Sequence, residues 1–271
     1  MRNTLQLKKN EVYQGDCLEL MKLIGDKSVD MILCDLPYGI TACEWDKVLP
    51  LNELWKQYKR ILKENGVVVL TASQPFTTDL INSNREWFRY CWVWDKDKGF
   101  GIFNSRFMPL KRHEDIVIFY KMAGRYFPIM KPAQKDRIRP LSSGNKKGCK
   151  NNIVGKENCI SSENYDNTLR FPDSILKFSR PVGSSLHPTE KPVSLFRYLI
   201  KTYTNEGELV LDNCIGSGTT AVACKQANRN FIGIELSQEY VDIANKRLQQ
   251  DNLHAFFQTQ GVLTEPSPNR N

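Results

Sequence analysis

Residues 209–220 read LVLDNCIGSGTT, a strand pattern that runs through a glycine-rich turn into a helix pattern. Glycines such as Gly216 and Gly218 let a backbone turn tightly and approach a ligand closely. The next strand pattern, 231–235, ends in Glu235, about 20 residues after the turn, where doubly wound folds place a carboxylate for ribose hydroxyls. This stretch therefore predicts a doubly wound α/β fold that binds an adenosine-containing ligand.

The glycine turn by itself does not name that ligand. The dinucleotide fingerprint G-x-G-x-x-G has Ala221 at its third glycine position here, and an alanine is tolerated there. The turn alone therefore leaves NAD open beside other adenosine cofactors.

On both sides of this stretch, short apolar runs alternate with helical patterns, which is typical of parallel strands joined by crossover helices. Strands are expected at 29–34, 66–71, 90–94, 115–120, 208–212 and 231–235. Helices are expected at 51–63, 77–82, 193–203, 219–228 and 238–249. The pattern indicates one α/β domain with an insert.

A second motif, Asp35-Leu36-Pro37-Tyr38, directly follows the strand pattern 29–34, and open α/β sheets bind ligands at the carboxyl ends of their strands. Methylation of an amino group on a base would explain these residue types. The amino nitrogen of adenine is a poor nucleophile because its lone pair is delocalised into the ring. Acceptors aimed at both N–H bonds favour a pyramidal nitrogen with a localised lone pair. Asp35 offers one acceptor, and the carbonyl of Leu36, held extended by Pro37, offers the other. Tyr38 offers a flat face for stacking a base that has left the duplex.

Together with two further motifs, these residues resemble the β-class DNA amino-methyltransferases. That family carries a [D/N/S]-P-P-[Y/W] tetrad upstream of its cofactor turn, and here 35–38 precedes 212–218. Residues 187–192 read HPTEKP, similar to the H-P-T-x-K-P element of the family, and Gly15-Asp16-Cys17 is similar to its segment beside the cofactor adenine. The resemblance implies a Rossmann-like, doubly wound α/β fold of the S-adenosylmethionine-dependent methyltransferase type. Its mixed sheet would have seven strands, and a target-recognition region would be inserted in it.

The resemblance also assigns roles by position. The catalytic residues would be Asp35, Leu36, Pro37 and Tyr38. S-adenosylmethionine would be bound by Asp16, Asp35, His187, Lys191, Asp212, Cys214, Gly216, Gly218, Thr219, Thr220, Glu235 and Leu236. Asp16 would hold the adenine, Glu235 the ribose, and His187 and Lys191 the methionine end. Asp at the first tetrad position usually goes with adenine N6 and Ser with cytosine N4, so Asp35 favours adenine.

Two positions depart from the family pattern. Leu36 replaces the usual first proline of the tetrad, but its carbonyl is retained, so activity is expected to survive. Cys214, preceded by Asn213, replaces the phenylalanine common in the cofactor motif. This second change bears on packing against the cofactor and so on affinity.

A basic region separates the two halves of the catalytic pattern. The net charge of +8 fits a polyanionic partner, because Lys and Arg displace counterions from phosphate. The densest basic cluster comprises Lys131, Lys135, Arg137, Arg139, Lys146, Lys147 and Lys150, and we expect it to contact double-stranded DNA. Residues 121–185 would be the target-recognition insert, 1–120 and 186–258 the catalytic domain, and 259–271 a flexible tail.

Other sequence features narrow the class of protein. The eight cysteines form no C-x-x-C pair, so no metal is expected. No signal peptide is recognised, so the cytoplasm of a bacterial or phage-infected cell is expected, with the thiols reduced. No apolar run is long enough to span a bilayer, so no membrane partner is expected.

The favoured function is methylation of adenine N6 at a specific site in double-stranded DNA. Three alternatives stay open: cytosine N4, an RNA or protein-amide acceptor, and a DNA-binding regulator without activity. A homodimer is expected from the family. The enzyme would be free-standing, phage-type or accompanied by a cognate restriction endonuclease.

Overall fold

The computed structural model describes residues 7–39, 46–122, 125–133, 166, 168–179 and 190–259, with side chains up to 250. The chain divides into two compact units. The first combines Met1–Phe127 with Ser174–Asn271, and the second is Pro128–Asp173. His187 and the predicted tail beyond 259 lie outside the described residues.

An eight-stranded sheet forms the centre of the first unit, in the order β1-β10-β9-β2-β3-β5-β4-β8. Its strands are β1 Glu11–Gln14, β2 Val29–Cys34, β3 Leu62–Ala72, β4 Phe88–Phe100, β5 Lys111–Phe119, β8 Ile175–Lys177, β9 Leu209–Asp212 and β10 Asn230–Glu235. All neighbours are parallel except β3–β5 and β5–β4. The mixed α/β sheet agrees with the predicted fold class.

The sheet has one strand more than the seven expected. The short β8 pairs with the outer edge of β4, where Val93 N donates to Ser174 O at 2.8 Å and Val93 pairs with Ile175. An edge strand presents unpaired backbone groups, and β8 satisfies some of those of β4. Its three residues lack the length of a recognisable strand pattern.

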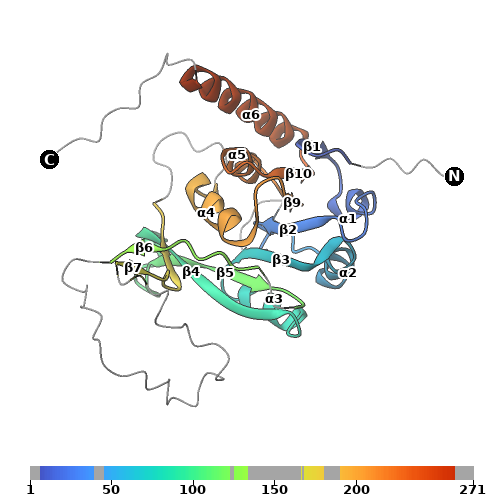
Figure 1. The fold of residues 1–271 in the computed structure, drawn as a ribbon. Helices are drawn as coiled ribbons and strands as arrows, with labels where there is room; N and C mark the ends of the chain where they lie inside the picture. The colour runs from blue at the N-terminus through green and yellow to red at the C-terminus, as the bar shows by residue number, and fades with distance from the viewer. Residues whose placement is uncertain are drawn as a thin grey trace, which may run out of the picture. The chain divides into compact units, whose positions relative to one another are not determined.

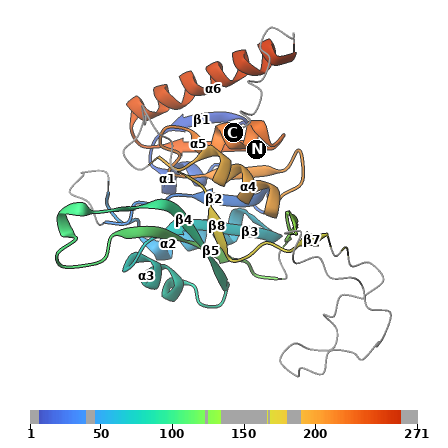
Figure 2. The ribbon, with the colours of Figure 1, turned by 90° about the vertical axis from the view of Figure 1, so that its left-hand side faces the viewer.

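Helices cover both faces of the sheet (Figures 1 and 2). Helices α1 Cys17–Met21, α2 Leu51–Ile61 and α3 Phe76–Ser83 pack on one face, and α4 Val193–Tyr203, α5 Thr219–Gln226 and α6 Gln238–Thr259 pack on the other. Both faces of strand β2 are covered, which explains why its residues 31–34 are all apolar. Ile32 and Cys34 enter the first core, whereas Met31 and Leu33 enter the second.

The predicted helices and strands are present, with shifted ends. Helix α2 buries Leu54, Trp55, Tyr58 and Ile61, as its spacing predicts, but it ends at Ile61 because the chain enters β3 at Leu62. Helix α6 continues to Thr259, beyond the end expected at 249.

The second unit contains a two-stranded antiparallel sheet, β6 Lys131–Pro132 with β7 Leu169–Arg170. It falls within the insert expected at 121–185. Both ends of that insert belong with the first unit. Phe127 N donates to Thr202 O at 2.8 Å, and the indole of Trp94 donates to Phe178 O at 2.8 Å. The compact unit is therefore narrower than the region that the composition marks.

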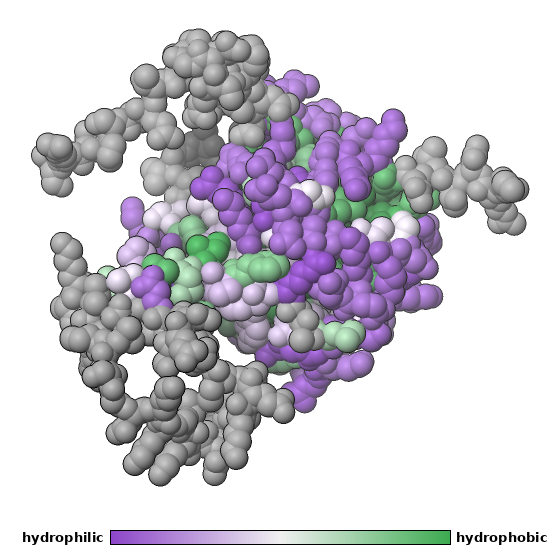
Figure 3. All heavy atoms as spheres, viewed as in Figure 1, coloured by the Kyte–Doolittle hydropathy of each residue, from purple (hydrophilic) through white to green (hydrophobic). Residues whose placement is uncertain are grey.

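The described surface seen in Figure 3 is mainly hydrophilic, with apolar side chains in small patches. Most large apolar side chains are accounted for by the two cores. Within the described part of the chain, no helix has the length and apolar character needed to cross a membrane.

Candidate active site at the carboxyl ends of the strands

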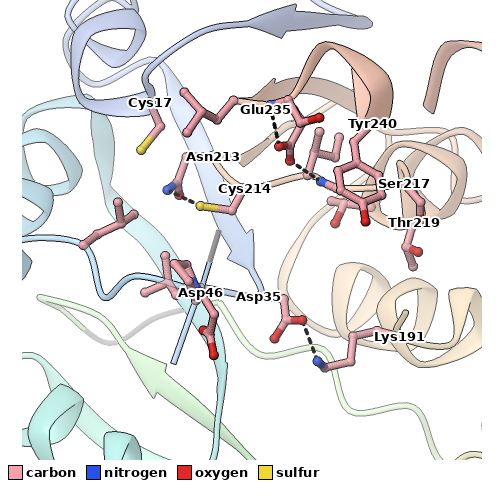
Figure 4. A pocket seen from close by; sticks show the side chains of 18 of the residues that line it. Cys17, Asp35, Asp46, Lys191, Asn213, Cys214, Ser217, Thr219, Glu235 and Tyr240 are labelled. Atoms are coloured by element: carbon pink, nitrogen blue, oxygen red, sulfur yellow. Dashed lines mark hydrogen bonds and ion pairs between the residues drawn. The ribbon is translucent and has the colours of Figure 1, made fainter. Parts of the chain in front are cut away.

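A cavity of about 750 Å³ opens at one edge of the sheet. Strands β1, β10, β9 and β2 are parallel neighbours, so their carboxyl ends meet at this edge. Residues at or just after these ends line the cavity, among them Glu235, Cys214 and Asp35 (Figure 4). Asp16, after β1, lines it too. Its volume is that of a typical small-molecule site, which is about 300–1,000 Å³.

The glycine turn after β9 has the backbone that its sequence predicts. Gly216 and Gly218 have φ angles of 51° and 86°, in the left-handed region that glycine adopts most easily. A Cβ at Gly218 would lie 2.9 Å from the Cβ of Ala244, so glycine also allows α6 to pack closely. Gly216 lines the cavity, and space is open on the side where its Cβ would be.

Glu235 joins this turn to the end of β10. Its two carboxylate oxygens accept from Gly216 N at 2.8 Å and from Ser237 N at 3.0 Å. Each carboxylate oxygen has a second lone pair, so Glu235 can still accept from the hydroxyls of a ligand. The next residue, Leu236, also lines the cavity and is 67% exposed.

Asp16 lies at the end of β1 and caps α1. Its Oδ1 accepts from Leu18 N at 2.7 Å and from Glu19 N at 3.2 Å, which satisfies two amide groups of the first helical turn. Gly15 N donates to Glu235 O at 2.9 Å, so Asp16 and Glu235 are held on the same side of the cavity.

Asp212 lies behind the turn and is 3% exposed. Its carboxylate accepts from Cys214 N at 3.1 Å and from the hydroxyl of Thr220. Burial raises the pKa of Asp212 to about 7, against the lowering effect of these hydrogen bonds. The residues lining the cavity include Thr219 and Thr220 but neither Asp212 nor Gly218, so these two shape the turn from behind.

Three thiols lie beside the turn. A hydrogen bond with Cys214, together with burial, raises the pKa of Cys17, and burial raises the pKa of Cys34 to about 12. Asn213 accepts from the hydroxyl of Tyr58 at 2.5 Å, and its amide lies 3.5 Å from Cys214 Sγ. The thiols thus stay uncharged at neutral pH, and Cys214 is packed where the family has phenylalanine. Among the described residues, no group of three or more His, Cys, Asp or Glu side chains is arranged to hold a metal ion.

Asp35 follows β2 on the other side of the cavity. Its Oδ1 accepts from the hydroxyl of Tyr38 at 2.7 Å and from that of Thr71, and its Oδ2 lies 2.5 Å from Lys191 Nζ. Figure 4 shows Asp35 and Lys191 pointing toward one another. The carboxylate is 23% exposed, so it is held in place while it still faces the cavity.

Lys191 connects Asp35 to a second buried carboxylate. The Lys191 side chain is 5% exposed, and its Nζ also lies 3.4 Å from Glu114 Oε2. Burial lowers the pKa of Lys191, but Asp35 and Glu114 outweigh that effect and raise it. Burial raises the pKa of Glu114, but Lys191 and Lys96 outweigh that effect and lower it. The resemblance assigned Lys191 to the methionine end of the cofactor, whereas its observed partners are carboxylates at the tetrad.

The rest of the tetrad forms the wall next to Asp35. The ring of Tyr38 stacks on Phe76, with centroids 5.4 Å apart and an interplanar angle of 24°. Desolvation raises the pKa of Tyr38 well above its usual value, so the phenol keeps the proton that it donates to Asp35. Leu36 is 3% exposed, and Leu36 and Pro37 both line the cavity.

Several groups at the site lie outside the motifs, or, like Glu190, at the variable position of one. They are Thr71 on β3, Glu114 on β5, Lys96 on β4, and the pair Glu190–Arg247. Arg247 lies 2.6 Å from Glu190 and 3.3 Å from the hydroxyls of Ser217 and Thr219, so it ties α6 to the glycine turn. In the sequence, each is a single polar residue inside or beside a strand or helix pattern, and spacing does not single it out as a site residue.

The predicted DNA-binding cluster is described at one position only. Lys131 lies on β6 in the second unit and is exposed. Lys135, Arg137, Arg139, Lys146, Lys147 and Lys150 lie outside the described residues, as does His187.

Comparison with solved structures gives the class of protein. The M1.HpyAVI–SAM complex matches with a TM-score of 0.59 and 26% identity, over 88% of this chain and 98% of that one. The cytosine-N4-specific PvuII DNA methyltransferase matches with a TM-score of 0.61 at 16% identity, over 89% and 86% of the two chains. At 16% identity, the match to the PvuII enzyme shows a shared fold alone. The fold is that of the S-adenosylmethionine-dependent methyltransferases.

Sequence comparison gives the family. Residues 29–246 match the family N6_N4_Mtase, described as DNA methylase. The type II methyltransferase M1.MboII of Moraxella bovis is 28% identical over 260 residues, 90% of this chain and 98% of its own length. M.HpaI of Haemophilus parainfluenzae is 26% identical over 255 residues, 88% and 73% of the two chains. The chain belongs to this family of N6 and N4 DNA methylases, which confirms the resemblance and S-adenosylmethionine as the methyl donor.

Proposed function

We propose that this DNA methyltransferase transfers the methyl group to adenine N6 at a specific site in double-stranded DNA. The carboxylate of Asp35 at the end of β2 carries this proposal. It lines the cavity, and its position is fixed by Tyr38, Thr71 and Lys191. An Asp at the first tetrad position is the usual companion of an adenine acceptor in the family.

The residues of the cavity fit the cofactor at its other side. The open backbone at Gly216 allows close approach, and the carboxylates of Asp16 and Glu235 can accept from adenine and ribose groups. Ser217 and Thr219, which Arg247 holds, would face the methionine portion. When bound, S-adenosylmethionine supplies an electrophilic methyl group on a sulfonium.

The chain's own residues then prepare the acceptor. The target base has to leave the duplex before it reaches a strand-end cavity. Asp35 accepts a hydrogen bond from one N–H of the amino group, and the carbonyl of Leu36 accepts from the other. As the N–C bond forms, the bond from the methyl group to the sulfonium would break, its electron pair would stay on sulfur, and the cofactor would leave as a neutral thioether. The nitrogen has to give up one proton, and Asp35 is the carboxylate next to it. Holding the two reactants in one cavity lowers the entropic part of the barrier.

The wider setting follows from the proposed substrate. The basic cluster from Lys131 to Lys150 would contact phosphates, which fixes the position of the protein on DNA without reading the sequence. Relatives named as type II methyltransferases suggest a cognate restriction endonuclease. A homodimer and a cytoplasmic location complete the proposal.

The proposal is tested by identifying the methylated base. The purified chain is incubated with labelled S-adenosylmethionine and mixed-sequence genomic DNA, which is then digested to nucleosides. Label on N6-methyladenosine is the expected result.

Label on N4-methylcytosine would contradict the choice of adenine and leave the family and mechanism intact. Transfer to RNA or protein, or cofactor binding without transfer to any acceptor, would contradict the DNA activity itself. The Asp35→Ala variant serves as the control for label that arises from a contaminating enzyme.

A further inference from the structure

The hairpin between β4 and β5 displays large apolar side chains to solvent. Ile102 is 66% exposed, Phe103 95%, Phe107 86% and Met108 57%. Single exposed apolar side chains are common on protein surfaces, but a contiguous group marks an interaction site more often. Two aromatic rings on one tip therefore need a partner of matching chemistry.

The tip is ordered by its own backbone. Gly101 adopts a φ of 91° and begins the 3-10 turn η1 Ile102–Asn104. Asn104 N donates to Gly101 O at 2.9 Å, and Phe107 N donates to Asn104 O at 2.9 Å. These bonds hold Phe103 and Phe107 on a compact turn, which lowers the entropy lost when they bind.

The base of the hairpin is part of the catalytic cavity. Lys111 and Glu114 on β5 line it, and Lys96 on β4 pairs with Glu114, which in turn faces Lys191. Figure 2 shows the hairpin extending beyond the helices of the first unit as an arm. A molecule that contacts the tip would therefore lie beside the mouth of the cavity.

The surroundings of the tip favour a polyanion. Every residue from 97 to 113 is exposed, and this stretch carries Lys98, Arg106 and Lys111 against the single acid Asp97, while its fourth cation, Arg112, is paired with Asp95 at the base of the hairpin. Cations on both sides of an apolar tip suit duplex DNA, because they can contact phosphates while the apolar side chains enter between base steps. A second copy of this chain would bring the same excess of positive charge, and like charges oppose such a contact.

We propose that this tip is a wedge that enters the DNA duplex beside the target base, led by Phe103 and Phe107. Extruding a base breaks its stacking and leaves a gap in the duplex. An aromatic ring that fills the gap restores part of that stacking and holds the base out while Asp35 acts on it. The inference rests on the proposed methylation of double-stranded DNA.

The test compares two substrates after the methylated sequence has been mapped. One duplex has the target adenine paired, and the other has it opposite a mismatched base, which is cheaper to extrude. The Phe103→Ala/Phe107→Ala variant should lose about 10- to 100-fold in kcat/KM on the paired duplex, in keeping with the stacking contributed by one or two aromatic rings. Most of the loss should disappear on the mismatched duplex, and Phe103→Leu/Phe107→Leu should retain part of the activity.

Met122→Ala is the matched control, because Met122 is also exposed, at 59%, but follows the far end of β5. Cofactor affinity and the unfolding midpoint should not change in any variant. A double variant within about twofold of the control on the paired duplex overturns the wedge. An equal loss on both duplexes, or a change of oligomeric state, also overturns it in favour of a contact between copies. If the unmodified chain methylates no DNA, the proposed function fails first, which is a different outcome.

Discussion

The two sides of the cavity are held by different kinds of interaction. On the side proposed for the cofactor, Asp16 and Glu235 accept from backbone amides, including that of Gly216 in the turn after β9. On the acceptor side, Asp35 depends on side chains from other parts of the chain, including Thr71 and Lys191. The first side is held by backbone groups, and the second is held by side chains that tertiary packing brings together.

This difference has a consequence for how each side responds to change. A backbone-built site keeps its geometry when a single distant side chain is lost. A buried network of charges does not, because removing one member leaves the others unpaired in a region of low dielectric. Variants on one side should therefore change mainly the affinity for the cofactor, and variants on the other should change mainly the rate of methyl transfer.

The largest expected effect comes from the acceptor side. Asp35→Ala should lower kcat by about 10³-fold, because it removes an acceptor aimed at the reacting amino group. Affinity for S-adenosylmethionine, measured by calorimetry, should stay near that of the unmodified chain. Asp35→Asn is the matched control, since it retains the size and one oxygen. A near-normal rate for Asp35→Ala would show that the carboxylate is not catalytic.

The opposite pattern is expected on the cofactor side. Glu235→Ala should raise the Kd for S-adenosylmethionine by about 10- to 100-fold, in keeping with the loss of hydrogen bonds to a charged group. At saturating cofactor, kcat should recover. Glu235→Gln keeps one acceptor oxygen, so its Kd should lie between that of the unmodified chain and that of Glu235→Ala. An unchanged Kd for Glu235→Ala would remove the ribose assignment.

Lys191 sharpens the comparison, because its Nζ lies beside Asp35 and Glu114, whereas the family pattern assigns it to the cofactor. Lys191→Met should lower kcat by about tenfold, equal to ~1.4 kcal/mol of barrier. The pKa of Glu114 should rise once its largest cationic neighbour is gone, so the acid limb of the pH–rate profile should move upward. Lys191→Arg should preserve the profile. A rise in the Kd for the cofactor with an unmoved profile would return Lys191 to the methionine end.

The last prediction concerns stability instead of catalysis, and is a pH dependence of folding at Asp212. Burial raises its folded pKa to about 7 from the usual 3.8, so the folded state keeps a proton that the unfolded state loses. The free energy of unfolding should therefore fall as the pH rises from about 4 to about 7, and level off above that. In urea titrations, Asp212→Asn should lose this slope relative to the exposed control Asp79→Asn. An identical slope in both variants would contradict the raised pKa.

The cofactor side was largely predictable from the sequence. The strand 209–212, the glycine turn and Glu235 are close in the chain, so spacing alone places them at one strand end. The φ angles of Gly216 and Gly218 agree with that reading. Asp212 and Gly218 were expected to bind the cofactor, but in the structure they support the turn without lining the cavity.

The acceptor side was predictable only in its tetrad. Thr71 comes beside Asp35 because Cys34 pairs with Leu70 in the register of β2 and β3, and a register cannot be counted from spacing in one strand. Glu114 stands in a stretch that looks like a polar turn, but the long antiparallel pairing of β4 with β5 turns it toward Lys191. These contacts depend on strand order, which local patterns do not encode.

The most direct measurement is a crystal structure with S-adenosylmethionine bound. We predict density in the strand-end cavity, with the adenosine against Asp16 and Glu235 and the methyl group directed toward Asp35. A cofactor bound elsewhere, or one whose methyl group faces away from the tetrad, would contradict the division of the cavity into a cofactor side and an acceptor side.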